Sequence, residues 1–169
     1  MKPLNVALIH QERGSVDCGL ATVNMVTKYW ELPLTFNDIQ KHLKVDKLGI
    51  YCPQMGSYLI QQGFDVALVH FNPGLFTLNE VGKSEKEIKT HLQNLLKKKR
   101  KRGDKKVIRY FLKFLKDGGK MEVKIPTEED IRGELNNNRP VIAVLTSNFL
   151  TASVPRFNFH FNVITGIDD

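Results

Sequence analysis

Residues 11–26 read QERGSVDCGLATVNMV. This stretch combines a loop, the start of a helix and a cysteine, and the predicted structure is built around it. Asp17 is a favourable N-cap residue, and apolar side chains follow it at helical spacing as far as Trp30. The pattern therefore predicts a helix from Cys18 to about Trp30.

A cysteine in the first turn of such a helix has a special environment. The positive end of the helix dipole and the unpaired N–H groups of the first turn both favour thiolate over thiol. Gln11 lies seven residues upstream of Cys18, and Gly14 and Ser15 allow the chain between them to bend. A lone cysteine at this position is more often a small buried hydrophobic residue than a nucleophile. A catalytic role for Cys18 therefore requires a second functional group, such as a base, close to the sulfur. His160, in an apolar run near the C-terminus, is the candidate partner.

Gln11, the triplet Asp17-Cys18-Gly19 and His160 in HFNVITGID together resemble the papain-like (clan CA) cysteine peptidases. The nearest likeness is to the family that processes double-glycine leader peptides of bacteriocins, with its free-standing relatives. The resemblance covers about residues 5–70 and 125–169. It implies that Cys18 is the nucleophile, that His160 is the general base and that Gln11 belongs to the oxyanion hole.

The residue that would orient the imidazole of His160 stays open. The family carries an Asp in an Asp-Pro pair for this purpose, and no Asp-Pro occurs in this sequence. Asn158 and Asn162 flank His160 on one face of the predicted strand. Asp168 would lie on the same face of the strand as His160, but about 26 Å away if the strand stays straight. A residue beyond the end of the chain is the fourth candidate.

The remaining pattern predicts an α+β fold in one domain over residues 1–169. By the resemblance, an N-terminal helical half packs on a C-terminal antiparallel sheet. Helical patterns occupy residues 36–43, 48–63, 83–116 and 128–135, and strand patterns occupy residues 6–9, 64–71, 123–125, 141–145 and 159–167.

Charge is concentrated in one segment. Residues 83–120 hold fifteen of the 25 basic and four of the 18 acidic residues, a net charge of +11 that leaves −4 for the rest of the chain. We interpret this segment as an inserted hairpin of two amphipathic helices with a turn at Gly103-Asp104. The basic patch Lys97–Lys106 is either a solvated tip or a docking patch for an acidic peptide, an anionic membrane surface or nucleic acid. No aromatic residue is interleaved at the tip, which argues against nucleic acid.

Composition limits the remaining functions. The chain has two cysteines, Cys18 and Cys52, which form neither a CxxC motif nor the cysteine framework of a disulfide-rich protein. A reducing, cytoplasmic location is therefore expected. No apolar run is long enough for a transmembrane segment. His42, His70 and His91 have no metal-ligand spacing, so neither a metal nor a cofactor is expected.

The sequence thus predicts a thiol-dependent peptidase or amidase, a papain-like hydrolase that acts on a peptide or protein substrate. A preference for small residues such as glycine follows from the resemblance alone. Two alternatives share the same fold: a catalytically idle peptide-binding module, and an acyltransferase that uses the same Cys–His pair. A third is an interaction protein that works through its basic hairpin.

Overall fold

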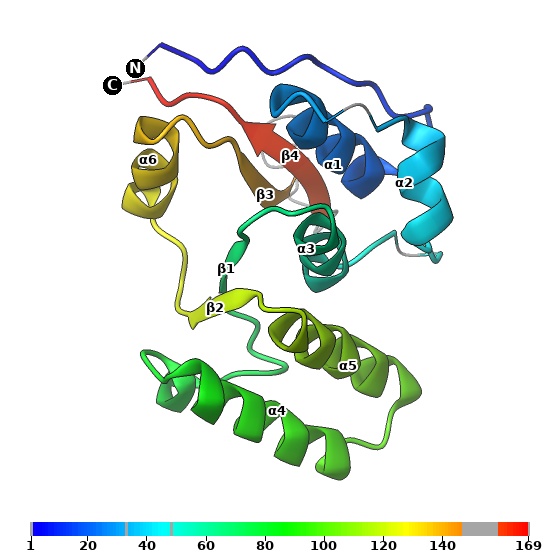
Figure 1. Ribbon diagram of the computed structural model, residues 1–169. Helices are drawn as coiled ribbons and strands as arrows, with labels where there is room; N and C mark the ends of the chain where they lie inside the picture. Colours follow the sequence, from blue (N-terminus) through cyan, green and yellow to red (C-terminus); the bar gives the residue numbers. More distant parts are fainter. Residues whose placement is uncertain (1, 33, 48, 147–158, 169) are drawn as a thin grey trace, which may run out of the picture. The chain divides into compact units, whose positions relative to one another are not determined.

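The computed structural model describes residues 2–32, 34–47, 49–146 and 159–168 (Figure 1). The chain divides into two compact units, one formed by Met1–Ile50 with Thr127–Asp169 and the other by Tyr51–Pro126. Both units combine helices with a small sheet, and this mixture is compatible with the α+β class that the sequence predicts.

The first unit has three helices among its described residues, α1 (Cys18–Tyr29), α2 (Phe36–His42) and α6 (Glu128–Asn136). The predicted helix after Asp17 is confirmed, because α1 begins at Cys18 and ends one residue before Trp30. Leu20 and Val23 are fully buried, so the apolar stripe read from the sequence is the face that packs into the unit.

The sheet of the first unit is an antiparallel pair, β3 (Val141–Thr146) with β4 (Phe159–Ile164). Leu145 lies opposite His160 in the register, and Ala143 lies opposite Asn162. The helix α1 packs against β4, and α6 packs against β3. Figure 1 shows α1 (blue) alongside β4 (red).

The strand predicted at Val6–Ile9 is wrong, because these residues have no ladder partner and form no strand. The chain is held just before them, where the Leu4 N–H donates to the Thr165 carbonyl oxygen at 2.7 Å. The strand β4 ends at Ile164, opposite Val141, the first residue of β3, rather than at Ile167 as expected.

The second unit runs from α3 (Cys52–Gln61) to β1 (Ala67–His70), the short 3-10 helix η1 (Leu78–Glu80), α4 (Glu85–Lys98), α5 (Arg102–Lys116) and β2 (Lys120–Val123). The strands β1 and β2 pair in parallel, with Ala67 opposite Lys120 and His70 opposite Val123. Parallel neighbours need a long crossover connection, and α4 with α5 forms it here.

A continuous hydrophobic core fills the second unit and is built largely from the charged segment itself. Its fully buried members include Ile88, Leu92, Ile108, Phe111 and Phe114. The helices α4 and α5 contact each other, and α5 also contacts α3. The turn between α4 and α5 spans residues 99–101, so Gly103-Asp104, expected to form the turn, lies in the first turn of α5.

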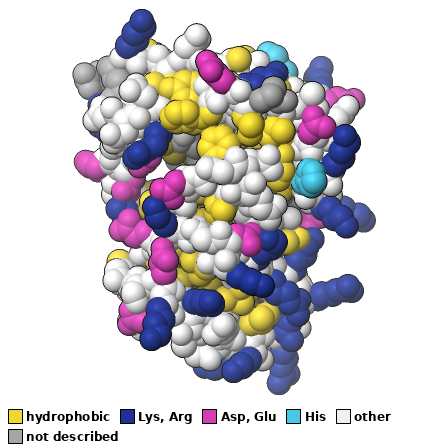
Figure 2. Space-filling view, viewed as in Figure 1, with side chains coloured by type: hydrophobic (Ala, Val, Ile, Leu, Met, Phe, Trp, Pro, Cys, Tyr) yellow, Lys and Arg dark blue, Asp and Glu magenta, His cyan; other side chains and the backbone are white. Residues whose placement is uncertain are grey.

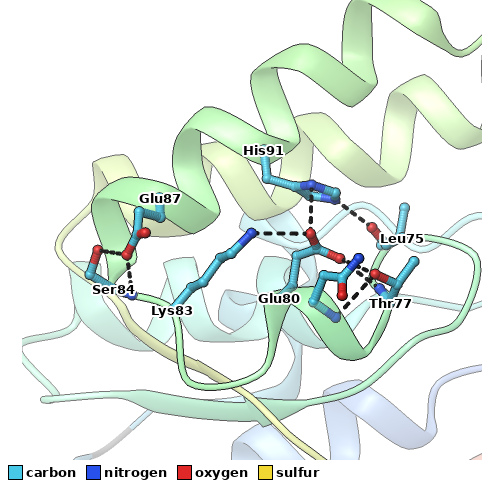
Figure 3. Close-up of polar contacts among 8 residues, drawn as sticks. Leu75, Thr77, Glu80, Lys83, Ser84, Glu87 and His91 are labelled. Atoms are coloured by element: carbon cyan, nitrogen blue, oxygen red, sulfur yellow. Dashed lines mark hydrogen bonds and ion pairs between the residues drawn. The ribbon is translucent and has the colours of Figure 1, made fainter.

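A buried carboxylate fixes the loop that leads into α4 (Figure 3). Glu80 accepts hydrogen bonds from the Thr77 N–H at 2.8 Å and the Thr77 hydroxyl at 2.7 Å. The other carboxylate oxygen lies 3.4 Å from both Lys83 Nζ and His91 Nδ1. The bonds from Thr77, followed by its neighbouring cations, lower the pKa of Glu80 to about 2.

Candidate active site

Cys18 is the first residue of α1, and its thiol is free and half-buried. Asp17 stands at the N-cap position, as expected, but its side chain accepts no hydrogen bond from the first turn in this fully described stretch. The donors at the start of α1 therefore lack a side-chain acceptor from their own cap.

Gln11 lies in the loop that leads into α1. Gly14 has a positive φ of 81°, and the Ser15 N–H donates to the Glu12 carbonyl oxygen at 3.0 Å, so the loop bends where the sequence predicts. The Gln11 Nε2 donates to the Ser15 carbonyl oxygen at 3.2 Å. A carboxamide nitrogen has two hydrogens, so Ser15 orients the group and leaves one donor available.

The buried oxygen of the same carboxamide, Gln11 Oε1, has no hydrogen-bond partner among the described residues. A buried acceptor without a partner costs about 1–3 kcal/mol. The Gln11 carboxamide is therefore not placed for stability alone. A buried polar group without a partner is often one that is held ready for a ligand.

His160 is the second residue of β4. A hydrogen bond near the end of α1 indicates how the helix lies along this strand. The Tyr29 hydroxyl, at the end of α1, donates to the Asn138 carbonyl oxygen at 2.9 Å. Asn138 lies three residues before β3, and the first residue of β3, Val141, lies opposite Ile164. The end of α1 therefore lies near the end of β4.

The two elements also have similar lengths. About 16 Å separates Cys18 from Tyr29 along the helix axis. About 13 Å separates His160 from Ile164 along the strand. The helix α1, which begins at Cys18, therefore packs along β4, whose second residue is His160.

The candidates for orienting His160 differ in their surroundings. The Asn162 Nδ2 donates to the His160 carbonyl oxygen at 3.1 Å, so this carboxamide reaches back along the strand toward the histidine. Asp168 is exposed and lies four residues beyond the end of β4. Asn158 lies outside the described residues.

Leu145 is a neighbour of His160 that the sequence did not single out. It lies directly opposite the histidine in the β3–β4 register, and 47% of it is exposed. Residues directly opposite in an antiparallel pair share one face of the sheet. Nothing in the sequence specifies this pairing, because register depends on the whole connection between the strands.

The other candidate groups belong to the core of the second unit. Burial raises the pKa of the Cys52 thiol to about 12, so this sulfur stays protonated, as expected for a packing residue. His70 is half-buried, and the loss of hydration lowers its pKa to about 4. Within the described ranges, no three His, Cys, Asp or Glu side chains are grouped as metal ligands. No helix in the described part of the chain is long and apolar enough to cross a bilayer.

Comparison with known protein families matches the chain to the Peptidase C39 family over residues 5–100. The match covers Gln11 and Cys18, ends before His160, and spans more than half of the 169 residues. No curated protein and no solved structure matches the chain. The family match confirms the resemblance read from Gln11 and the Cys18 motif: the chain belongs to the Peptidase C39 family, the papain-like cysteine peptidases of double-glycine leaders.

Proposed function

We propose that this protein is a thiol-dependent peptidase or amidase in which Cys18 is the nucleophile, His160 the general base and Gln11 an oxyanion donor. The observation that supports the proposal best is the packing of α1, which begins at Cys18, against β4, which contains His160. Family membership supports the reaction class, and the free, half-buried thiol supports the choice of nucleophile.

The proposed reaction begins when His160 takes the proton of the Cys18 thiol. The thiolate attacks the carbonyl carbon of the scissile amide and forms a C–S bond, and the carbonyl oxygen becomes an oxyanion. The free N–H of the Gln11 carboxamide and the backbone N–H of Cys18 stabilise this charge.

Collapse of the tetrahedral intermediate then breaks the C–N bond, and His160 gives its proton to the leaving amine. Water attacks the resulting thioester while His160 accepts the water proton. The acid product leaves, and the proton returns to the Cys18 sulfur. In an acyltransferase, an amine would take the place of water in this second half.

The experiment is cleavage of a peptide library that varies around a Gly-Gly pair, followed by mass spectrometry with the full chain. Cys18→Ala should abolish turnover, whereas Cys52→Ala should retain it because Cys52 is a partly buried residue that packs against the core of the second unit. Gln11→Ala should lower kcat by roughly 100- to 1000-fold through loss of one oxyanion donor.

Turnover that survives Cys18→Ala would overturn the thiol mechanism. A wild-type chain that binds peptides without cleaving them would instead indicate the idle binding module. A product joined to an added amine, in place of the free acid, would indicate the acyltransferase.

For the residue that orients His160, the contact of Asn162 with the His160 backbone favours Asn162 over Asp168. Asn162→Ala should lower kcat, leave KM nearly unchanged and shift the pH profile of kcat, because a freely rotating imidazole is less often in its reactive orientation. Asn162→Asp should restore part of the rate. Asp168→Ala serves as the control. If only this control lost kcat, Asp168 rather than Asn162 would be the residue that orients His160.

A further inference from the structure

The turn between α4 and α5 carries a dense group of positive charges. We define the cationic tip as the five exposed basic side chains at this turn: Lys97, Lys98, Arg100, Lys101 and Arg102. Every residue from 83 to 120 is described, and within this segment no ion pair involves any of the five. Figure 2 shows Lys and Arg side chains crowding the surface over α4 and α5.

The charge arrangement opposes the stability of α5. Its N-cap residue is Lys101, which makes no side-chain capping bond, and its first residue is Arg102. The N-terminus of a helix carries partial positive charge and favours acidic side chains. The one acidic residue in this first turn, Asp104, is engaged 3.7 Å from Lys99 Nζ. Lys101 and Arg102 therefore place positive charge where helix stability alone would favour the opposite sign.

A partner at this surface would meet charge rather than apolar side chains. Ile108, Phe111 and Phe114 form the apolar face of α5 and are fully buried in the core of the second unit. No large apolar side chain in the described segment 83–120 is exposed. The helices are thus unable to insert an apolar face into a partner, and binding must be electrostatic.

We propose that the cationic tip binds an anionic lipid surface, with headgroup phosphates as the counter-charges, which is a property beyond the proposed peptidase activity. Clusters of four to eight Lys and Arg residues are typical of binding to anionic headgroups. The five side chains lie within six consecutive residues at the turn between two helices, so their charges act together on one surface. The rest of the chain outside residues 83–120 has a net charge of −4 and is repelled by such a surface.

Single-stranded nucleic acid fits the tip less well. Stacking of bases requires aromatic rings that have no other ring contact. The aromatic residue nearest to the tip in the sequence is Tyr110, and the centre of its ring lies 5.7 Å from that of the Tyr51 ring. The Nζ of Lys106 also lies 5.8 Å from the centre of the Tyr110 ring. Duplex nucleic acid needs no stacking and is therefore the competing partner that the experiment must separate.

The test is sedimentation of the full chain with vesicles of phosphatidylcholine containing about 30 mol% phosphatidylglycerol, in about 0.1 M salt. Changing the five tip residues to Gln should lower the partition coefficient by at least about 100-fold. The matched control changes five exposed lysines of the first unit to Gln: Lys2, Lys28, Lys41, Lys44 and Lys47. Both variants lower the formal net charge from +7 to +2, so only the position of the charge differs.

We expect the control to sediment like the wild-type chain, and pure phosphatidylcholine to bind none of the three. Equal losses in the two variants would overturn the proposal, because net charge alone would explain binding. Tighter binding to a 20-base-pair duplex than to the vesicles would also overturn it, in favour of nucleic acid. Peptide cleavage in solution should be the same in the tip variant and the wild-type chain, so this outcome is independent of the proposed peptidase function.

Discussion

Two histidines lie beside Phe76 in the second unit, and their hydrogen-bonding surroundings differ. His70 lies 6.2 Å and His91 lies 5.7 Å from Phe76, measured between ring centres. The His70 Nε2 is buried and has no partner among the described residues, which favours the neutral ring. His91 presents one nitrogen to the Leu75 carbonyl oxygen at 2.8 Å and the other to Glu80 at 3.4 Å (Figure 3).

Acid should therefore destabilise the second unit through His70. Its folded pKa of about 4 lies below the unfolded value of 6.5, so the free energy of unfolding falls as the pH decreases from 6.5 toward 4. At pH 5 the loss should be roughly 1–2 kcal/mol. His70→Phe should remove this part of the pH dependence, as measured by urea unfolding at pH 7 and pH 5. The same loss in the variant and the wild-type chain would show that His70 is not the group that titrates.

At the scale of elements, glycine decides how closely α3 approaches α5. A Cβ built on Gly56 would lie 2.6 Å from Phe114 Cε2, and Phe114 is fully buried. Since the ring is locked in the core, it has little room to move away. Gly56 is thus a packing requirement rather than a site of chain flexibility.

Gly56→Ala should destabilise the protein by about 1–3 kcal/mol, because the added methyl group overpacks the α3–α5 contact. Gly133→Ala is the matched control, since Gly133 lies inside α6 with nothing within 4 Å of its Cβ position. That change should stabilise by about 0.5–1 kcal/mol through helix propensity. Urea unfolding followed by circular dichroism measures both, and a neutral Gly56→Ala would contradict the packing described for α3.

Elements with a local signal were predictable from sequence, and elements that depend on a distant partner were not. The start of α1 follows from Asp17 and the apolar stripe behind it, because a helix forms its own hydrogen bonds. Residues 6–9 have an apolar pattern typical of a strand but lack a neighbour with which to pair. The parallel pairing of Ala67 with Lys120 joins residues 53 positions apart, and no local pattern encodes it.

The candidate site shows the same division. Cys18 and Gln11 could be selected from the sequence because the helix start and the loop before it are local features. The preference for Asn162 over Asp168 required the hydrogen bond to the His160 backbone. Leu145 required the register of β3 and β4.

At the scale of the whole molecule, the proposed chemistry and the excess charge belong to different units. Gln11, Cys18 and His160 all lie in the first unit, and residues 83–120 lie in the second. The segment expected to be an insertion also contains most of the hydrophobic core of its unit. Deleting it would therefore unfold that unit, and substitutions at the cationic tip are the appropriate way to separate charge from catalysis.

The central claim is that His160 activates Cys18. The most direct measurement is the rate at which iodoacetamide alkylates each cysteine at pH 6, resolved by peptide mapping, in the wild-type chain and in His160→Ala. We predict that Cys18 reacts at least about tenfold faster in the wild-type chain than in His160→Ala, because His160 accepts the thiol proton in the proposed mechanism. We also predict that Cys52 reacts slowly in both proteins, because burial raises the pKa of its thiol to about 12. Equal Cys18 rates in the two proteins would contradict the account.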